Sequence, residues 1–422
     1  MSSRGLVQRT LAPLLALVVL VATGVTGVPA LARTNLSIAA LGGTGYQKVQ
    51  DTLLQDYQAA NPDVKVTIQY LSWDEIQSKL LVSIAGGVVP DIVMLPTRYA
   101  PSFIENGLVS PVDYRAFGLT SAADIPKLFM PGMAGALMYK DRFYFVPTEL
   151  TGLGLYYNRD MLETRGIGEI PSTWEELGTV AGKLTRMGAQ GVEQAGLSFL
   201  NWGPFTGFWF LSFLRSAGTD WIEDGRPAFS SPKAVQALQV FADLYHKYKA
   251  ANPNFGIENF NAGKVGFIPG LTVALFDFRN TGLPFDLGVA PYPHLASGRP
   301  ASIAYAWGYY VTSGSKNQTA AWKLIDFMTS EKHAPTWLSE AKVFIPRGTT
   351  WFADLARQDR QLGTLLAGLQ SASMELAHPM YDEIMNAINV ACQNIIAKGL
   401  GVAVAANELD TAITQILKKS NR

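Results

Sequence analysis

The sequence predicts an α/β fold in which mainly parallel sheets are flanked by helices. Between residues 36 and 95, strand-like apolar runs alternate with helical segments, and this alternation is typical of the crossover units that build parallel sheets. The chain has 422 residues, of which 48% are hydrophobic and 16% are charged, so it can bury a large core. This length suits two or three domains.

The first elements are bounded by residues that end strands and helices. The predicted order is strand 36–41, helix 46–60, strand 64–68, helix 74–85 and strand 91–95. The first strand is followed by a glycine-rich loop at Gly42–Gly45. Asn61-Pro62 ends the first helix and Gly86-Gly87 ends the second, because proline and glycine interrupt helices.

The same alternation resumes later in the chain. Thr173-Trp174-Glu175-Glu176 has the form of a capping box and predicts a helix that runs to about Met187. Ser231-Pro232 predicts the start of a helix through Tyr248, with proline at the first helical position. The other predicted strands are 143–146, 153–157 and one that ends over 288–293. Helices are predicted at 322–329 and 381–396. The lack of a Gly/Ser-rich linker predicts two lobes joined by ordered strands.

The first 32 residues have the pattern of a secretory signal peptide. Arg4 and Arg9 precede a nearly uninterrupted apolar run over 11–28, and Ala30 and Ala32 form an A-x-A cleavage site. We therefore expect cleavage after Ala32 and an exported, periplasmic or otherwise extracytoplasmic protein. The alternative is an uncleaved membrane anchor. No cysteine lies near this junction, so a lipoprotein is not expected.

Charge and motif content exclude several classes of protein. Lys+Arg and Asp+Glu are both 34, and this balance argues against a nucleic-acid binder. With one cysteine, Cys392, and four scattered histidines, we expect no metal site and no cofactor. The Gly-Thr-Gly loop fits neither a dinucleotide nor a Walker fingerprint, and no G-x-S-x-G is present. Glu149 and Asp277 are the candidate carboxylate pair if the protein were instead a secreted carbohydrate-active enzyme.

Six segments in order resemble the family 1 extracellular solute-binding proteins of bacterial ABC importers, which include maltose-, multiple-sugar- and glycerol-phosphate-binding proteins. The matching segments are 55–66 (QDYQAANPDVKV), 90–93 with 106–111 (PDIV, NGLVSP), 144–147 (YFVP), 155–162 (LYYNRDML), 171–177 (PSTWEEL) and 260–267 (FNAGKVGF). Together they are spread over residues 55–267 of the chain.

This resemblance implies a two-lobe periplasmic binding protein fold of type II, with a multi-strand hinge. One lobe would comprise residues 33–150 and 307–352, and the other 151–306 and 353–422. The ligand would bind between the lobes, and hinge closure would present the loaded form to the membrane subunits of the permease. The resemblance further implies a non-catalytic monomer that needs no cofactor.

Sugar sites combine aromatic side chains with polar groups. The aromatic candidates are Trp73, Trp202, Trp209 and Trp307. Polar partners are expected in loops at the carboxyl ends of strands, where open α/β sheets bind ligands. These candidates are Thr44, Gly45, Thr97, Arg98, Tyr99, Glu149, Asp277 and Arg347. The sequence leaves two roles open for Arg347, a contact with the ligand and a surface ion pair.

The ligand class is a mono-, di- or short oligosaccharide, and a glycerol-phosphate-like solute is the alternative. Leu95 and Gly270-Leu271-Thr272 stand where the maltose-binding type has tryptophan, which argues against maltodextrin. Tyr156-Tyr157 and Tyr309-Tyr310 superficially suit Fe(III). However, neighbouring side chains on a strand point to opposite faces, so one tyrosine of each pair at most could face a metal.

Overall fold

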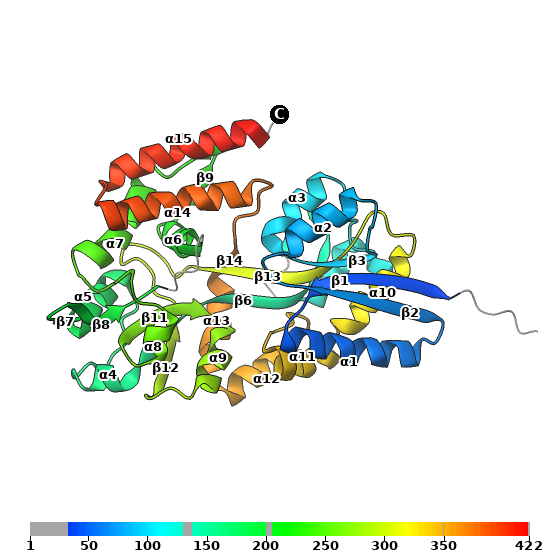
Figure 1. The fold of residues 1–422 in the computed structure, drawn as a ribbon, viewed down its shortest axis with the longest axis horizontal. Helices are drawn as coiled ribbons and strands as arrows, with labels where there is room; N and C mark the ends of the chain where they lie inside the picture. The colour runs from blue at the N-terminus through cyan, green and yellow to red at the C-terminus, as the bar shows by residue number, and fades with distance from the viewer. Residues whose placement is uncertain (1–32, 130–136, 200–204, 349, 421–422) are drawn as a thin grey trace, which may run out of the picture.

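The computed structural model describes residues 33–129, 137–199, 205–348 and 350–420. The predicted signal peptide and Trp202 lie outside these residues. The described chain is a mixed α/β structure with two groups of elements joined in the middle (Figure 1), and this confirms the predicted fold class. Within these residues, no helix is long and apolar enough to cross a membrane.

A ten-stranded sheet runs through both groups, with the order β2-β1-β3-β13-β6-β11-β8-β7, while β12 pairs with β6 and β14 with β13. Its strands are β1 (Thr34–Leu41), β2 (Val64–Leu71), β3 (Ile92–Pro96), β6 (Phe145–Asn158), β7 (Arg186–Gly188), β8 (Gly191–Leu197), β11 (Val265–Leu271), β12 (Leu287–Pro291), β13 (Ser302–Val311) and β14 (Ala372–Met374).

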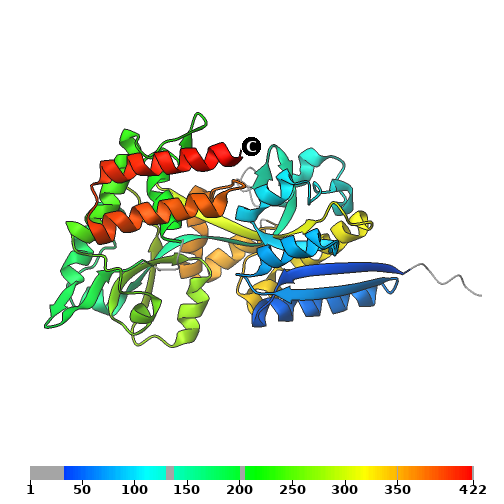
Figure 2. The same ribbon diagram turned by 45° about the horizontal axis from the view of Figure 1, so that its top comes forward.

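The first group contains β1, β2 and β3, which are mutually parallel as the alternating sequence pattern predicts. Helix α1 (Thr44–Ala60) and α11 (Ala334–Ala341) lie on one side of these strands, and α2 (Ile76–Ala85) and α3 (Ala100–Glu105) on the other (Figures 1 and 2). Helix α10 (Gln318–Met328) packs against α1 and β13.

The second group is built on β8 and β11, which are parallel; β7 pairs with β8, and β12 pairs with β6. Its long helices lie together and bury their apolar faces against each other. They are α5 (Trp174–Leu184), α6 (Phe205–Ser216), α7 (Pro232–His246), α14 (Tyr381–Lys398) and α15 (Val402–Ser420). Helices α9 (Ala274–Thr281), α12 (Thr350–Gln358) and α13 (Arg360–Gly368) lie together on another side (Figure 1).

Strands β6 and β13 connect the two groups. All fourteen residues of β6 are buried, and β6 pairs antiparallel with β13, β11 and β12. Strand β13 pairs with β6 and also with β3 of the first group. Both faces of these strands are covered, so Tyr156 and Tyr157 are both buried, as are Tyr309 and Tyr310.

Several predicted elements need correction at their limits. The two strands predicted at 143–146 and 153–157 are largely one continuous strand, β6. The helix that starts at the Thr173 cap ends at Leu184 rather than near Met187, because the chain turns there into the hairpin of β7 and β8. The predicted caps are confirmed, since the side chains of Thr173 and Ser231 accept the amide hydrogens of Glu176 and Ala234.

Candidate functional site

The carboxyl ends of β1, β2 and β3 meet at one edge of the sheet, beside the point where β6 and β13 cross between the two groups. The parallel register places Leu71 opposite Leu41 and pairs Ile92 with Ile38. The segment Thr97–Tyr99 directly follows β3, and Trp73 follows β2. This is the edge at which open α/β sheets bind ligands.

Glu149 lies at the centre of this edge. It sits in β6, is 4% exposed, and is paired in register with Trp307 of β13. The hydroxyl of Tyr46, in the first turn of α1, donates a hydrogen bond to its carboxylate. Burial raises the pKa of Glu149 to about 7, although the Tyr46 hydrogen bond and the charge of Arg98 oppose that rise. A carboxyl with this pKa is a strong acceptor that can also hold a proton near neutral pH.

Arg98 is a buried cation held against a buried carboxylate. Its Nη1 lies 3.9 Å from Oε2 of Glu375, and its backbone N–H donates to Oε1 of Glu375 at 3.2 Å. The guanidinium carbon lies 5.1 Å from the ring centre of Tyr99 and 5.9 Å from that of Tyr305. Burial raises the pKa of Glu375, against the opposing charge of Arg98. The cationic charge at this edge is therefore already countered within the protein.

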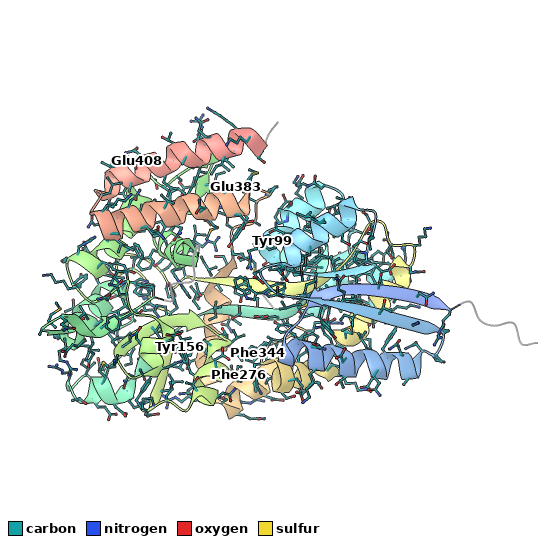
Figure 3. The ribbon with its side chains drawn as sticks, viewed as in Figure 1. Tyr99, Tyr156, Phe276, Phe344, Glu383 and Glu408 are labelled. Carbon is teal, nitrogen blue, oxygen red and sulfur yellow. The ribbon has the colours of Figure 1, made fainter. Side chains whose placement is uncertain are left out.

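The second group reaches this site through the start of α14. The hydroxyl of Tyr381 donates to Oε2 of Glu375 at 3.3 Å, and its ring lies edge-on to that of Tyr99 at 6.5 Å. In Figure 3, Tyr99 and Glu383 lie on the facing sides of the two groups. Burial raises the pKa of Asp382, again opposed by Arg98. The beginning of α14 thus adds aromatic and acidic groups to those at the end of β3.

Sequence reasoning missed four members of this site: Tyr46, Tyr305, Glu375 and Tyr381. Tyr46 could have been found, because it directly follows the glycine-rich loop. No motif marks Glu375 or Tyr381, since their partners Thr97, Arg98 and Tyr99 are far away in the sequence. A cavity of about 40 Å³, room for one or a few water molecules, lies beside Thr97 and Glu375.

The predicted tryptophans differ widely in exposure. Trp73, in the turn after β2, is 61% exposed, and such a ring is free to stack on a ligand. Trp307 is 5% exposed, and its carbonyl accepts a hydrogen bond from the Thr148 hydroxyl at 3.3 Å. Trp209 is fully buried in α6 beside Phe210 and Phe213, in the core of the second group.

Thr44 and Gly45 form the start of α1. Gly43, the residue before it, has a φ of 105°, in the left-handed region that favours glycine. A Cβ on Gly45 would lie 2.5 Å from the carbonyl oxygen of Glu340, so Gly45 permits the close approach of α1 to α11. Gly45 therefore has a packing role beside the Tyr46–Glu149 contact.

Arg347 is buried and bonded within the first group. Its Nη1 donates to Asp326 Oδ1 at 2.8 Å and to Thr329 Oγ1 at 3.1 Å, and its guanidinium stacks on Phe117 at 5.5 Å. Of the two roles that the sequence left open, the structure contains the ion pair. In that pair the guanidinium is buried and the carboxylate is partly exposed.

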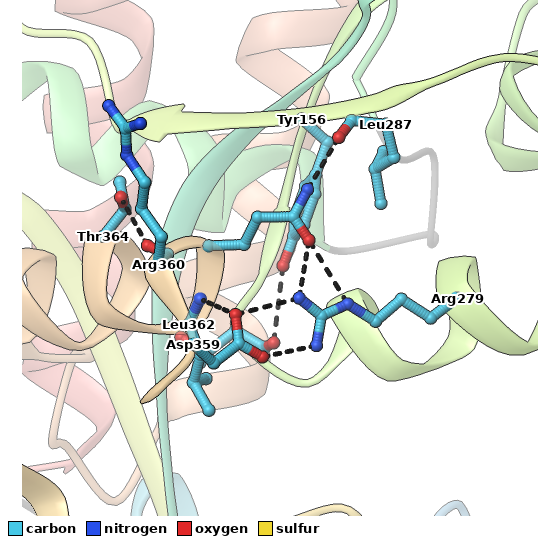
Figure 4. A network of polar contacts seen from close by, with 9 residues as sticks. Tyr156, Arg279, Leu287, Asp359, Arg360, Leu362 and Thr364 are labelled. Atoms are coloured by element: carbon cyan, nitrogen blue, oxygen red, sulfur yellow. Dashed lines mark hydrogen bonds and ion pairs between the residues drawn. The ribbon is translucent and has the colours of Figure 1, made fainter. Parts of the chain in front are cut away.

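Asp277 lies on α9, on another element from Glu149, with its side chain exposed. Its neighbour Arg279 donates to both carboxylate oxygens of Asp359 at 2.6 and 3.0 Å and to Gln361 Oε1 at 2.6 Å (Figure 4). Gln361 in turn donates to the Leu287 carbonyl at 2.6 Å. This network joins α9, α13 and β12, so the charge of Arg279 serves the packing of these elements.

In the described part of the chain, no three His, Cys, Asp or Glu side chains are grouped so that they could hold a metal ion. Two of the four tyrosines considered for iron donate hydrogen bonds within the protein. The Tyr156 hydroxyl donates to the Leu271 carbonyl at 2.7 Å, and that of Tyr309 to Gln50 Oε1 at 2.6 Å.

Known proteins resemble this chain in sequence and in fold. A binding protein of Brucella abortus (strain 2308) is 24% identical over 381 residues, which cover 86% of this chain and 88% of that one. The maltotriose-binding protein of Pyrococcus abyssi is 22% identical over 307 residues, covering 71% and 63% of the two chains.

Two solved structures match almost the whole fold. The cyclic alpha-maltosyl-1,6-maltose binding protein from Arthrobacter globiformis has a TM-score of 0.79 at 16% identity, covering 92% of this chain and 100% of that one. UgpB from Mycobacterium tuberculosis, in complex with glycerophosphocholine, has a TM-score of 0.78 at 18% identity, covering 92% and 99%. Residues 41–335 match the family described as bacterial extracellular solute-binding protein, and the chain belongs to that family.

Proposed function

We propose that this protein is the substrate-binding component of an ABC importer and that it captures a carbohydrate between its two lobes. The observation that carries the proposal is the family match over residues 41–335. The names of relatives support the ligand class, since one is a maltotriose-binding protein and another is the diacetylchitobiose binding protein DasA of Streptomyces coelicolor.

In this proposal the lobes are residues 33–150 with 307–352 and residues 151–306 with 353–422. The ligand would bind where Glu149, Arg98 and Tyr99 face the start of α14. Closure about the crossing strands would surround the ligand, and the permease subunits would recognise the closed form. The protein would be exported with cleavage after Ala32, without a lipid anchor, and would act as a non-catalytic monomer.

The chemistry of the site favours an uncharged sugar over a phosphate-bearing solute. Arg98 is the buried cation of the cluster, and Glu375 lies against it. The charge of Arg98 also lowers the pKa of Glu149 and of Asp382, against the effect of their burial. A phosphate would meet three carboxyl groups and one arginine that is already countered. Sugar hydroxyls, in contrast, can donate to carboxylates and stack their apolar ring faces on Tyr99 and Trp73.

A thermal-shift panel on the purified full-length protein tests the proposal. The probes are glucose, maltose, maltotriose, lactose, sn-glycerol 3-phosphate and glycerophosphocholine. A ligand at about 100 times its dissociation constant adds about 2.7 kcal/mol and raises the unfolding midpoint visibly. We expect a shift with a neutral saccharide and no consumption of that sugar by chromatography. A shift with the phosphate-bearing probes alone would contradict the sugar assignment, and steady loss of a sugar would indicate an enzyme.

A further inference from the structure

Glu375 joins three segments that are distant in the sequence. It lies between β14 and α14, is 4% exposed, and its backbone N–H donates to the Ala304 carbonyl in β13 at 2.8 Å. Its Oε1 accepts from the Thr97 hydroxyl at 2.8 Å, beside the backbone and side-chain contacts to Arg98. Its Oε2 accepts from Tyr381 at 3.3 Å. One buried carboxylate therefore contacts the end of β3, the crossing strand β13 and the start of α14.

These contacts reinforce one another. The Thr97 hydroxyl that donates to Glu375 also accepts the Ala306 amide of β13 at 3.2 Å, so the end of β3 is bonded to the crossing strand at the same point. Arg98 and Glu375 are both buried, and removing one of two buried opposite charges leaves the other uncompensated. Movement of the segment that leads into α14 away from the first group would separate Glu375 from Arg98 and Thr97.

We propose that Glu375 is a positioning residue that holds Arg98 and Thr97 in place and clasps the start of α14 to the first lobe, thereby favouring the closed arrangement of the protein without ligand. The inference rests on the proposed function only in taking the edge beside Arg98 as the ligand site. The physical reason is that α14 packs on α6 and α15 of the second group, so separation of the lobes must stretch or break the Tyr381–Glu375–Arg98 chain of contacts.

The test compares Glu375→Gln with wild type in the full-length protein, with no ligand added. Small-angle X-ray scattering measures the radius of gyration, and hydrogen exchange follows the amides of 97–99 and 375–381. We expect Glu375→Gln to have the larger radius of gyration. Its amides in both segments should exchange about tenfold or more faster, because the contacts of Glu375 hold the two segments together. An unchanged radius with unchanged exchange at 97–99 would overturn the proposal.

Asp326→Asn is the matched control, because it removes the negative charge that faces another buried arginine, Arg347, away from α14. We expect this control to lower the unfolding midpoint without changing the radius of gyration or the exchange of 97–99. If it reproduced the changes of Glu375→Gln, the effect would be general loosening and the positioning role would fail.

Two milder variants keep the test decisive if Glu375→Gln does not fold. Thr97→Val and Tyr381→Phe each remove one hydrogen bond to Glu375 and keep the charge pair, so both should raise exchange in the same two segments by a smaller factor. No change in either variant would overturn the clasp. These measurements are made without sugar, so their outcome is independent of the thermal-shift panel. If no sugar binds in the panel, the role of Glu375 can still be confirmed, and if a sugar binds, the role of Glu375 can still be contradicted.

Discussion

The hydroxyl of Tyr46 donates a hydrogen bond to the carboxylate of Glu149, and this contact joins the first turn of α1 to the strand that crosses between the two groups. Burial is the main cause that raises the pKa of each group, and Glu149 is 4% exposed. The contact fixes the acceptor of Glu149 at the edge where β3 and β13 meet.

The raised pKa of Glu149 predicts a pH dependence of stability. In the unfolded chain the carboxyl has its ordinary pKa of 4.5, whereas in the folded protein it holds its proton up to about 7. Its contribution to the free energy of unfolding is therefore fully present below pH 4.5 and is lost as the pH rises through 7, an effect of about 3 kcal/mol. In Glu149→Gln, which stays neutral, urea titrations between roughly pH 4 and pH 8 should lack this loss. A constant difference between the two proteins over that range would contradict the prediction.

Trp73→Ala should weaken sugar binding without unfolding the protein. The ring is 61% exposed, so its loss should change the free energy of unfolding by no more than about 0.5 kcal/mol. If Trp73 stacks on the ligand, calorimetric titration with the sugar found in the panel should give a dissociation constant about tenfold higher. Met187→Ala is the control, because Met187 is similarly exposed on β7. Equal dissociation constants for the two variants would show that Trp73 does not contact the sugar.

Gly45→Ala should destabilise the start of α1. The new Cβ would lie 2.5 Å from the Glu340 carbonyl oxygen and 2.9 Å from the Ala341 Cα, and both are backbone atoms that cannot rotate away. Overpacking of this kind costs about 1–3 kcal/mol, measured as a lower urea midpoint. Gly401→Ala is the matched control, since nothing lies within 4 Å of its added Cβ. A wild-type midpoint in Gly45→Ala would show that α1 and α11 can separate without cost.

Asp326→Asn should separate the two roles that the sequence left open for Arg347. Loss of the ion pair should cost about 2–3 kcal/mol of stability, because Arg347 is buried while Asp326 is partly exposed. Affinity for the sugar should stay at the wild-type value, since Nη1 of Arg347 is directed to Asp326 and Thr329 within the first group. A large loss of affinity in a folded variant would instead favour a ligand contact by Arg347.

Local signals in the amino-acid sequence indicate most of the elements and the α/β class. Helix periodicity, the Thr173 and Ser231 caps and the alternation of strands and helices indicate the α/β class, because these signals depend on residues within a few positions of each other. The tendency of open α/β sheets to bind ligands at the carboxyl ends of their strands also points to Thr97, Arg98, Tyr99 and Glu149 from the sequence alone.

Which of these residues meet, and what surrounds them, depends on the tertiary structure. Arg98 and Glu375 are 277 positions apart, and Tyr46 and Glu149 are 103 apart. Such contacts depend on the order of strands in the sheet, which brings β3, β6 and β13 side by side and is not encoded in any local pattern. The burial of Trp209 and Trp307 has the same origin, because exposure depends on which helices and strands cover a position rather than on its neighbours in the chain.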